Sequence, residues 1–228
     1  MTERPIILFD LDGTLADTAR DLGHTMNVLL ERHGRRTLPL ERVRPRVGAG
    51  ARKILEFGFA ETGDPASEAL LDELFDEFLA YYSAHIADHT VLFPGVREEL
   101  DRLADGDVKL GVCTNKAETL THQLLDTLDV ARYFPVVIGG DTLPVRKPDP
   151  APLLEAAARL EGTASHTVMI GDSATDINAA RAADIASICV TFGYTDIAPH
   201  ELGATALLDH FSDLPETLSA LLPRHFPR

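Results

Sequence analysis

Residues 5–15, PIILFDLDGTL, decide the fold. The continuous apolar run Ile6–Phe9 is typical of a strand that is buried on both faces of a parallel sheet. Asp10 and Asp12 follow, and residues two apart in an extended chain point the same way. Both carboxylates can therefore face the crevice beyond the strand ends, where open α/β sheets bind ligands. Because two like charges this close need a cation or a shared proton, the stretch indicates a site, although an ordinary turn also accounts for it.

The composition is that of a soluble globular protein. The 228 residues are 45% hydrophobic and 25% charged, which allows one large domain or a core with a smaller domain. The formal net charge is −15, from 21 basic and 36 acidic residues. A balance this acidic argues against nucleic acid or an anionic membrane as partner, but it leaves a small anionic substrate open.

The chain is expected to be cytoplasmic. Its two cysteines, Cys113 and Cys189, lie in apolar runs and are interpreted as buried free thiols in a reducing compartment. No apolar stretch reaches membrane-spanning length, and the first residues, MTERP, lead into a strand rather than a signal peptide.

The second half of the chain alternates between apolar runs and helical patterns. Strands are predicted at 108–113, 136–138, 168–170 and 187–190, with helices at 117–128, 151–160 and 173–183. This alternation is typical of βαβ units. The predicted fold class is α/β, with a three-layer Rossmann-like core around a parallel sheet.

Residues 16–88 carry helical periodicity and no strand pattern. Helices are predicted at about 17–33, at 51–59 and from Asp64 and Pro65 to about His85, after which residues 93–95 return the chain to the core. We therefore expect a core of residues 1–15 and 89–228, and an inserted all-helical cap domain of residues 16–88 that can close over the crevice. The sequence does not indicate the oligomeric state.

Polar residues recur where the later strands end. Thr114 and Asn115 can donate hydrogen bonds to phosphate oxygens, although both also suit a helix N-cap. Lys147 lies in a loop that two prolines stiffen, where a fixed ammonium can neutralise carboxylates and bind an anion. Taken alone, it could equally be a solvated loop lysine.

Two more carboxylates follow the strand at 168–170. Asp172 lies at the strand end and Asp176 one helical turn later, so the two are neighbours. Several carboxylates beside a phosphate site make the oxygen-rich environment that Mg²⁺ selects. Helix capping explains each residue separately, but not the recurrence of polar motifs at four strand ends.

The order of these motifs resembles a known family. DLDGT, Thr114-Asn115, Lys147-Pro148 and GDSATD are similar to the four motifs of the haloacid dehalogenase-like phosphohydrolases, and the helical insert resembles their cap of the first type. Within that superfamily the segments VGAG, TNKAET, RKPDPAPLL and TFGY resemble the phosphoglycolate phosphatases. One departure is Asp184, where that family usually has glycine.

The resemblance implies a mechanism. Asp10 is the expected nucleophile, which forms an aspartyl phosphate, and Asp12 is the expected general acid and then general base. Mg²⁺ is expected on Asp10, on the backbone carbonyl of Asp12 and on Asp172, with Asp176 as a ligand or just outside the ligand shell. Lys147 offsets charge as a catalytic and substrate-binding group. The remaining expected phosphate-binding residues are Leu11, through its backbone N–H, Thr114 and Asn115.

The expected reaction is hydrolysis of a small phosphorylated metabolite, 2-phosphoglycolate to glycolate and phosphate. A sugar-phosphate phosphatase or a phosphomutase is the alternative, although Val47 before Gly48 does not match the lysine of the mutases. A phosphorylated receiver module is an alternative of another class, but it needs neither Asp12 nor a helical insert.

Two features of the insert remain without an assigned role. Arg46 and the loop 48–52 could bind a substrate carboxylate or form a basic hinge, with equal support from the residue types. His85 and His89 have a helical metal spacing without a third ligand, so we interpret them as surface histidines.

Overall fold

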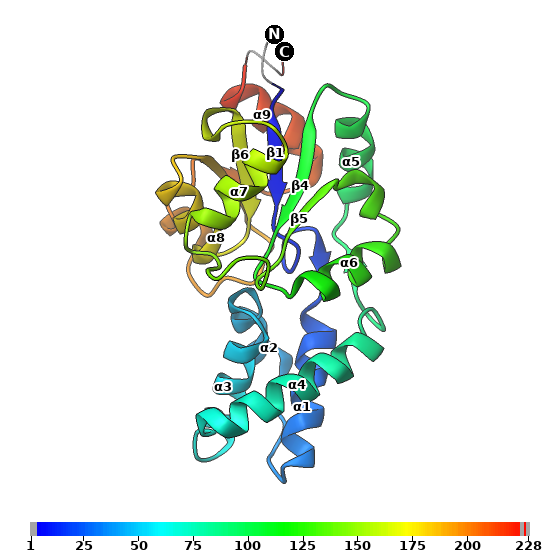
Figure 1. Cartoon of the computed structure of the whole chain (residues 1–228), viewed down its shortest axis with the longest axis vertical. Coiled ribbons are helices and arrows are strands. Elements are labelled where there is room, and N and C mark those ends of the chain that lie inside the picture. The colour runs from blue at the N-terminus through cyan, green and yellow to red at the C-terminus, as the bar shows by residue number, and fades with distance from the viewer. Residues whose placement is uncertain (1–3, 224–225, 227–228) are drawn as a thin grey trace.

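The computed structural model describes residues 4–223 and 226. Its main sheet has six parallel strands in the order β5-β4-β1-β6-β7-β8 (Figure 1). The strands are β1 (Ile6–Phe9), β4 (Lys109–Cys113), β5 (Val136–Ile138), β6 (Thr167–Gly171), β7 (Ala186–Val190) and β8 (Ala206–Leu208). Strand β1, which leads to Asp10, therefore has a hydrogen-bonded neighbour on each side.

Helices cover both faces of this sheet, which confirms the three-layer α/β class. Side chains of β1 alternate between two buried clusters, because successive residues of a strand point to opposite faces. Ile7 and Phe9 belong to the cluster that includes helices α5 (Val96–Ala104), α6 (Glu118–Thr127) and α9 (Leu214–Leu221). Ile6 and Leu8 belong to the cluster with α7 (Ala151–Arg159) and α8 (Ala174–Ala182).

The predicted strands are present, but three others had escaped prediction. The expectation of no strand within 16–88 is wrong, because β2 (Ala16–Asp17) pairs antiparallel with β3 (Val91–Leu92). Two residues are too few to show a period-two pattern. Strand β8 was also missed; it is a three-residue edge strand whose central residue, Leu207, is 44% exposed.

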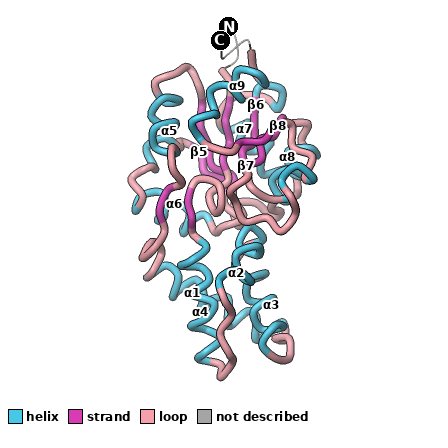
Figure 2. Tube along the Cα trace, turned by 180° about the vertical axis from the view of Figure 1, so that it is seen from behind, coloured by secondary structure: helices cyan, strands magenta, loops and turns pink. Residues whose placement is uncertain are grey.

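Four helices form a bundle beyond the carboxyl ends of the strands, and we call it the helical block (Figures 1 and 2). They are α1 (Ala19–Arg32), α2 (Leu40–Val43), α3 (Ala51–Thr62) and α4 (Glu68–Ala84), with a 3₁₀ segment at Arg44–Ala49. Met26, Phe59 and Phe78 are fully buried where these helices pack together. Helix α4 begins at Glu68 rather than near Pro65, because Ser67 accepts a hydrogen bond from the Leu70 N–H and caps it.

A buried carboxylate ties the start of the helical block to its return segment. Oδ2 of Asp21, on α1, accepts hydrogen bonds from the N–H groups of His89 and Thr90 at 3.0 and 2.8 Å, and from the Thr90 hydroxyl at 2.7 Å. The two connections between sheet and block are thus joined by side-chain contacts as well as by the β2–β3 pair.

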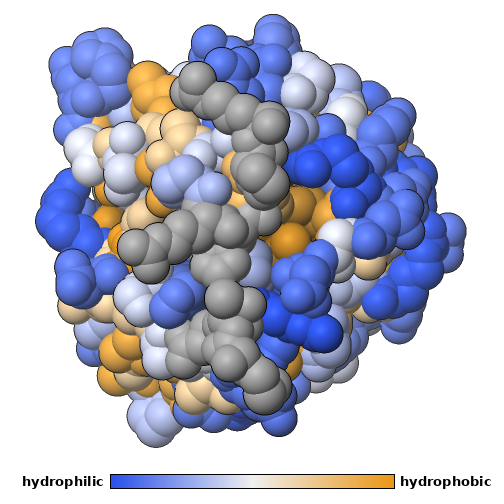
Figure 3. Space-filling view, turned by 90° about the horizontal axis from the view of Figure 1, so that it is seen from above, coloured by the Kyte–Doolittle hydropathy of each residue, from blue (hydrophilic) through white to orange (hydrophobic). Residues whose placement is uncertain are grey.

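Polar residues cover much of the end of the molecule opposite the helical block, with smaller hydrophobic areas among them (Figure 3). Within residues 4–223 and 226, no helix is both long and apolar enough to cross a membrane.

Candidate active site

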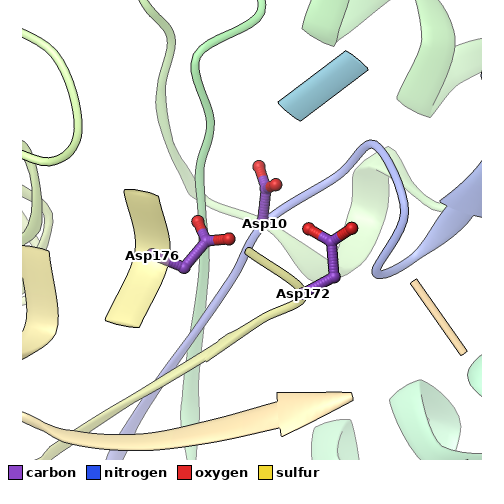
Figure 4. Close-up of side chains that lie close together, drawn as sticks. All are labelled: Asp10, Asp172 and Asp176. Carbon is purple, nitrogen blue, oxygen red and sulfur yellow. The ribbon is translucent and has the colours of Figure 1, made fainter. Parts of the chain in front are cut away.

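Three buried carboxylates meet at the carboxyl end of the sheet. Asp10 follows β1, Asp172 follows β6 and Asp176 lies in the first turn of α8. A carboxylate oxygen of each lies within 4.8 Å of the others, and Figure 4 shows Asp172 and Asp176 on either side of Asp10. The neighbouring parallel strands β1 and β6 bring the first two together, as the strand-end argument predicts.

The carboxylates of this cluster have unused oxygens. Oδ1 of Asp10 and Oδ1 of Asp172 are buried without a hydrogen-bond partner, whereas Oδ2 of Asp172 accepts from the Tyr194 N–H at 2.6 Å. Burial raises the pKa of Asp10 to about 6, because Lys147 only partly offsets it. Burial and the neighbouring Asp176 and Asp10 raise the pKa of Asp172 well above its usual value. Buried carboxylate oxygens whose charge is only partly compensated fit a divalent cation.

Lys147 pairs with two carboxylates of this cluster and is only 3% exposed. Its Nζ lies 3.1 Å from Oδ1 of Asp10, and it donates to Asp176 Oδ1 and to the Cys113 carbonyl, both at 2.6 Å. Burial works against its charge, but the carboxylates of Asp10 and Asp176 raise the pKa of Lys147 above its usual value. The loop lysine is therefore held charged inside the site rather than solvated.

The two carboxylate oxygens of Asp176 have different partners. Its Oδ2 accepts from the N–H of Ser173 at 3.0 Å and from the Ser173 hydroxyl at 2.8 Å, which closes a capping box at the start of α8. Its Oδ1 binds Lys147. Asp176 therefore both caps helix α8 and belongs to the carboxylate cluster.

Asp12 lies apart from the three clustered carboxylates. Its two carboxylate oxygens accept hydrogen bonds from Nζ of Lys116 at 2.8 and 3.0 Å. Lys116 is 8% exposed, and its pKa is raised, because the attraction of Asp12 and Tyr82 outweighs burial. Sequence reasoning assigned no role to Lys116, because a pattern along one segment does not show which distant carboxylate its ammonium meets.

The remaining predicted substrate-binding residues lie beside the cluster. Leu11 is buried, and a backbone hydrogen bond from it partly lowers the pKa of Asp10. The hydroxyl of Thr114, at the end of β4, accepts from the Lys116 N–H at 3.3 Å. The amide of Asn115 donates to the carbonyls of Lys147 at 3.1 Å and Gly48 at 3.4 Å. Asn115 thus joins the loop of Lys147 to the helical block, and its contact with phosphate stays a prediction.

A cavity of about 140 Å³ lies between the helical block and the core. Asp12, Asn115 and Lys116 line its core side. The block contributes mainly apolar side chains, namely Leu22, Val47, Ile54, Phe75, Phe78, Leu79 and Tyr82. The candidate acid, Asp12, therefore faces an enclosed space large enough for a small molecule.

Arg46 and Arg52 of the helical block have protein partners. Arg52 lines the cavity and pairs with Asp72 at 2.6 Å and Glu68 at 2.7 Å. Arg46 pairs with Asp196 of the core at 3.2 Å. The structure thus favours a bridging role for Arg46 over contact with a ligand.

The histidine pair lies outside the described site, and neither cysteine adds its thiol to the carboxylate cluster. His85 pairs with Asp88 on the surface, and neither His85 nor His89 belongs to a metal-competent cluster within the described residues. Cys113 and Cys189 are buried and free, as predicted.

Tyr194 is a further residue that sequence reasoning missed, although it lies in the TFGY segment. Its N–H binds Asp172, and its hydroxyl donates to Asp17 Oδ1 and accepts from the Thr18 N–H, both at 2.7 Å. One residue thus connects the carboxylate cluster to the segment that enters the helical block.

Comparison with known proteins identifies the family of this chain. The family described as haloacid dehalogenase-like hydrolase matches residues 7–190. A phosphoglycolate phosphatase of Caulobacter vibrioides is 43% identical over 216 residues, which cover 95% of this chain and 91% of that protein. A phosphoglycolate phosphatase of Agrobacterium fabrum is 39% identical, with 96% and 95% covered.

Solved structures share the fold of this chain. The crystal structure of a predicted phosphoglycolate phosphatase from Haemophilus somnus superposes with a TM-score of 0.88 at 26% identity, and covers 95% of this chain and 99% of its own. The expected family is confirmed by sequence and by structure: the chain belongs to the haloacid dehalogenase-like hydrolases and is a phosphatase of that family.

Proposed function

We propose that this protein is a Mg²⁺-dependent phosphomonoester hydrolase that converts 2-phosphoglycolate to glycolate and phosphate through an aspartyl phosphate on Asp10. The observation that carries the proposal is the buried cluster of Asp10, Asp172 and Asp176 around Lys147, beside a cavity that Asp12 lines. The names of the relatives support the substrate, and a cavity of about 140 Å³ suits a small leaving group.

In the first half-reaction a carboxylate oxygen of Asp10 attacks phosphorus, and the bond from phosphorus to the leaving oxygen breaks. Asp12 gives its proton to that oxygen as general acid. Lys147, 3.1 Å from Asp10, offsets the repulsion between carboxylate and phosphate. Backbone N–H groups from Leu11 onward, Thr114 and Asn115 are the proposed holders of the remaining phosphate oxygens.

The metal would be held by Asp10, Asp172 and Asp176, with the backbone carbonyl of Asp12 as a further ligand. Bound there, it would neutralise negative charge on the phosphoryl group. Oδ1 of Asp172, which is buried without a hydrogen-bond partner, supports this assignment.

We also propose that residues 16–88 act as a cap domain over a core of residues 1–15 and 89–228. The cavity between the helical block and the core supports this division. A small phosphorylated metabolite as substrate, without nucleic acid or membrane as partner, and a cytoplasmic location are part of the same proposal.

The decisive test is phosphate release from 2-phosphoglycolate and a panel of sugar phosphates, with Mg²⁺ or with EDTA. We expect wild type to prefer 2-phosphoglycolate and to need the metal, and D10N to lose at least about 10³-fold in kcat, because an amide is a poor nucleophile. The exposed control D76N should match wild type.

Other results of this assay would reject the substrate or the reaction. Preference for a sugar phosphate would retain the chemistry and reject the substrate. A stable phosphorylated Asp10 without turnover of any ester would favour a phosphomutase or a receiver module over a hydrolase.

A further inference from the structure

Lys116 pairs with Asp12 but has no role in the reaction proposed above. The ammonium binds both oxygens of the Asp12 carboxylate, at 2.8 and 3.0 Å. Within the described part of the chain, these are the only hydrogen bonds that this carboxylate accepts from a side chain. Both residues line the cavity, and both are less than a tenth exposed.

Three contacts fix the position of Lys116: one through its backbone, one with an aromatic ring and one with a carboxylate. It lies three residues after the end of β4, and its N–H donates to the Thr114 hydroxyl. Its Nζ lies 4.6 Å from the centroid of the Tyr82 ring on α4, at cation–π distance. A lysine side chain is flexible, so strand, aromatic ring and carboxylate together restrict it to one place.

We propose that Lys116 is a positioning residue that holds Asp12 in the orientation needed to accept a proton from water during hydrolysis of the aspartyl phosphate. The inference rests on the proposed function. A carboxylate bound at both oxygens by one ammonium keeps one orientation, whereas a carboxylate without a partner rotates. Misplacement of a catalytic group by about 1 Å costs up to roughly 10²-fold in rate.

Hydrolysis of the aspartyl phosphate requires water as the only reactant. Water oxygen forms a bond to phosphorus, and the bond from phosphorus to the Asp10 oxygen breaks, with its electron pair returning to the Asp10 carboxylate. The proton of the attacking water goes to an Asp12 oxygen. Inorganic phosphate leaves, and no oxidant, reductant or further reactant is required.

The substrate p-nitrophenyl phosphate allows hydrolysis of the aspartyl phosphate to be measured separately from its formation. Its leaving group departs as a stable anion and needs no general acid, so Asp10 can be phosphorylated even when Asp12 is misplaced. For K116M we expect a rapid burst of about one p-nitrophenol per protein, followed by turnover that is roughly 10- to 100-fold slower than in wild type. Acid-quenched protein should carry phosphate on Asp10. With 2-phosphoglycolate no burst is expected, because that leaving group needs the proton of Asp12.

The control is K53M, because Lys53 is exposed on α3, pairs with Glu56 and lies outside the cavity lining. It should show neither burst nor slowing. K116M that matches wild type would overturn the inference, as would a slow K116M with a native circular dichroism spectrum and no phosphorylated Asp10. If wild type turns over neither p-nitrophenyl phosphate nor 2-phosphoglycolate, the proposed function fails together with the inference, whereas a wild type active on p-nitrophenyl phosphate separates the two.

Discussion

Each carboxylate of the site is defined by its partners rather than by its residue type. Oδ1 of Asp172 is buried without a partner, and Oδ1 of Asp10 has only the Lys147 ammonium as partner. Both oxygens of Asp176 accept hydrogen bonds, and Asp12 is bound to Lys116. The oxygens without hydrogen bonds occur where a metal and a phosphoryl group are proposed, and the hydrogen bonds of Asp176 and Asp12 hold these two side chains in place.

Asp184 illustrates how the backbone restricts a residue outside the site. It has φ of 56°, in the left-handed region that glycine adopts without strain. This conformation accounts for the glycine that the phosphoglycolate phosphatases usually have at this turn. An aspartate tolerates the region better than most residues, so the departure is structurally permitted.

We expect D184G to raise the free energy of unfolding by up to about 1 kcal/mol, because the left-handed conformation costs an L-residue roughly that much. The measurement is urea unfolding followed by circular dichroism. D184A is the matched variant: it removes the carboxylate but keeps a Cβ, and it should not stabilise. Equal stabilisation by both variants would show that charge, not backbone strain, is responsible.

Sequence reasoning recovered the residues of the cluster because strand ends follow local rules. A buried strand such as Ile6–Phe9 is visible as a continuous apolar run, and parallel strands place their carboxyl ends on one edge. Lys116 and Tyr194 were missed because their partners lie 104 and 176 residues away in the chain. No local periodicity contains that information.

At the scale of elements, length decided what was predictable. The helices at 117–128 and 151–160 and the strand at 108–113 have enough residues to show a pattern, and they were found. Strands β2 and β3 have two residues each, and they exist because the chain crosses twice between sheet and helical block. Tertiary geometry rather than propensity creates such elements.

The Asp21 contacts should stabilise the helical block against the core. We expect D21A to lower the free energy of unfolding by roughly 3 kcal/mol, because three buried donors of His89 and Thr90 would lose a charged acceptor. D76A, which removes an exposed carboxylate from α4, should change it by less than about 0.5 kcal/mol. Urea unfolding measures both. A D21A variant as stable as D76A would mean that water replaces these contacts without cost.

At the scale of the whole molecule, the carboxylate cluster links stability to pH. The pKa of Asp10 is raised from 3.8 to about 6, so between these values the folded protein binds a proton that the unfolded chain has lost. Stability of the metal-free protein should therefore fall as pH rises from about 4 to 6. Above that window the ionised carboxylate remains a cost that a cation can relieve.

We accordingly expect Mg²⁺ to raise the melting temperature at pH 7.5 and to raise it much less at pH 5, where protons compete for Asp10. Differential scanning fluorimetry with Mg²⁺ or EDTA at both pH values measures this. D10N should show a smaller shift that depends less on pH. An equal Mg²⁺ shift in wild type and D10N would place the metal elsewhere.

The charges around Lys147 also determine the order in which the cation and the ester bind. Three carboxylates against one ammonium formally leave two uncompensated negative charges in the cluster, while the Asp12–Lys116 pair is neutral. A phosphate ester carries negative charge of its own, so the bare site repels it. Steady-state kinetics should thus follow a compulsory sequence, with the ester as second ligand and its apparent affinity rising with the concentration of divalent cation.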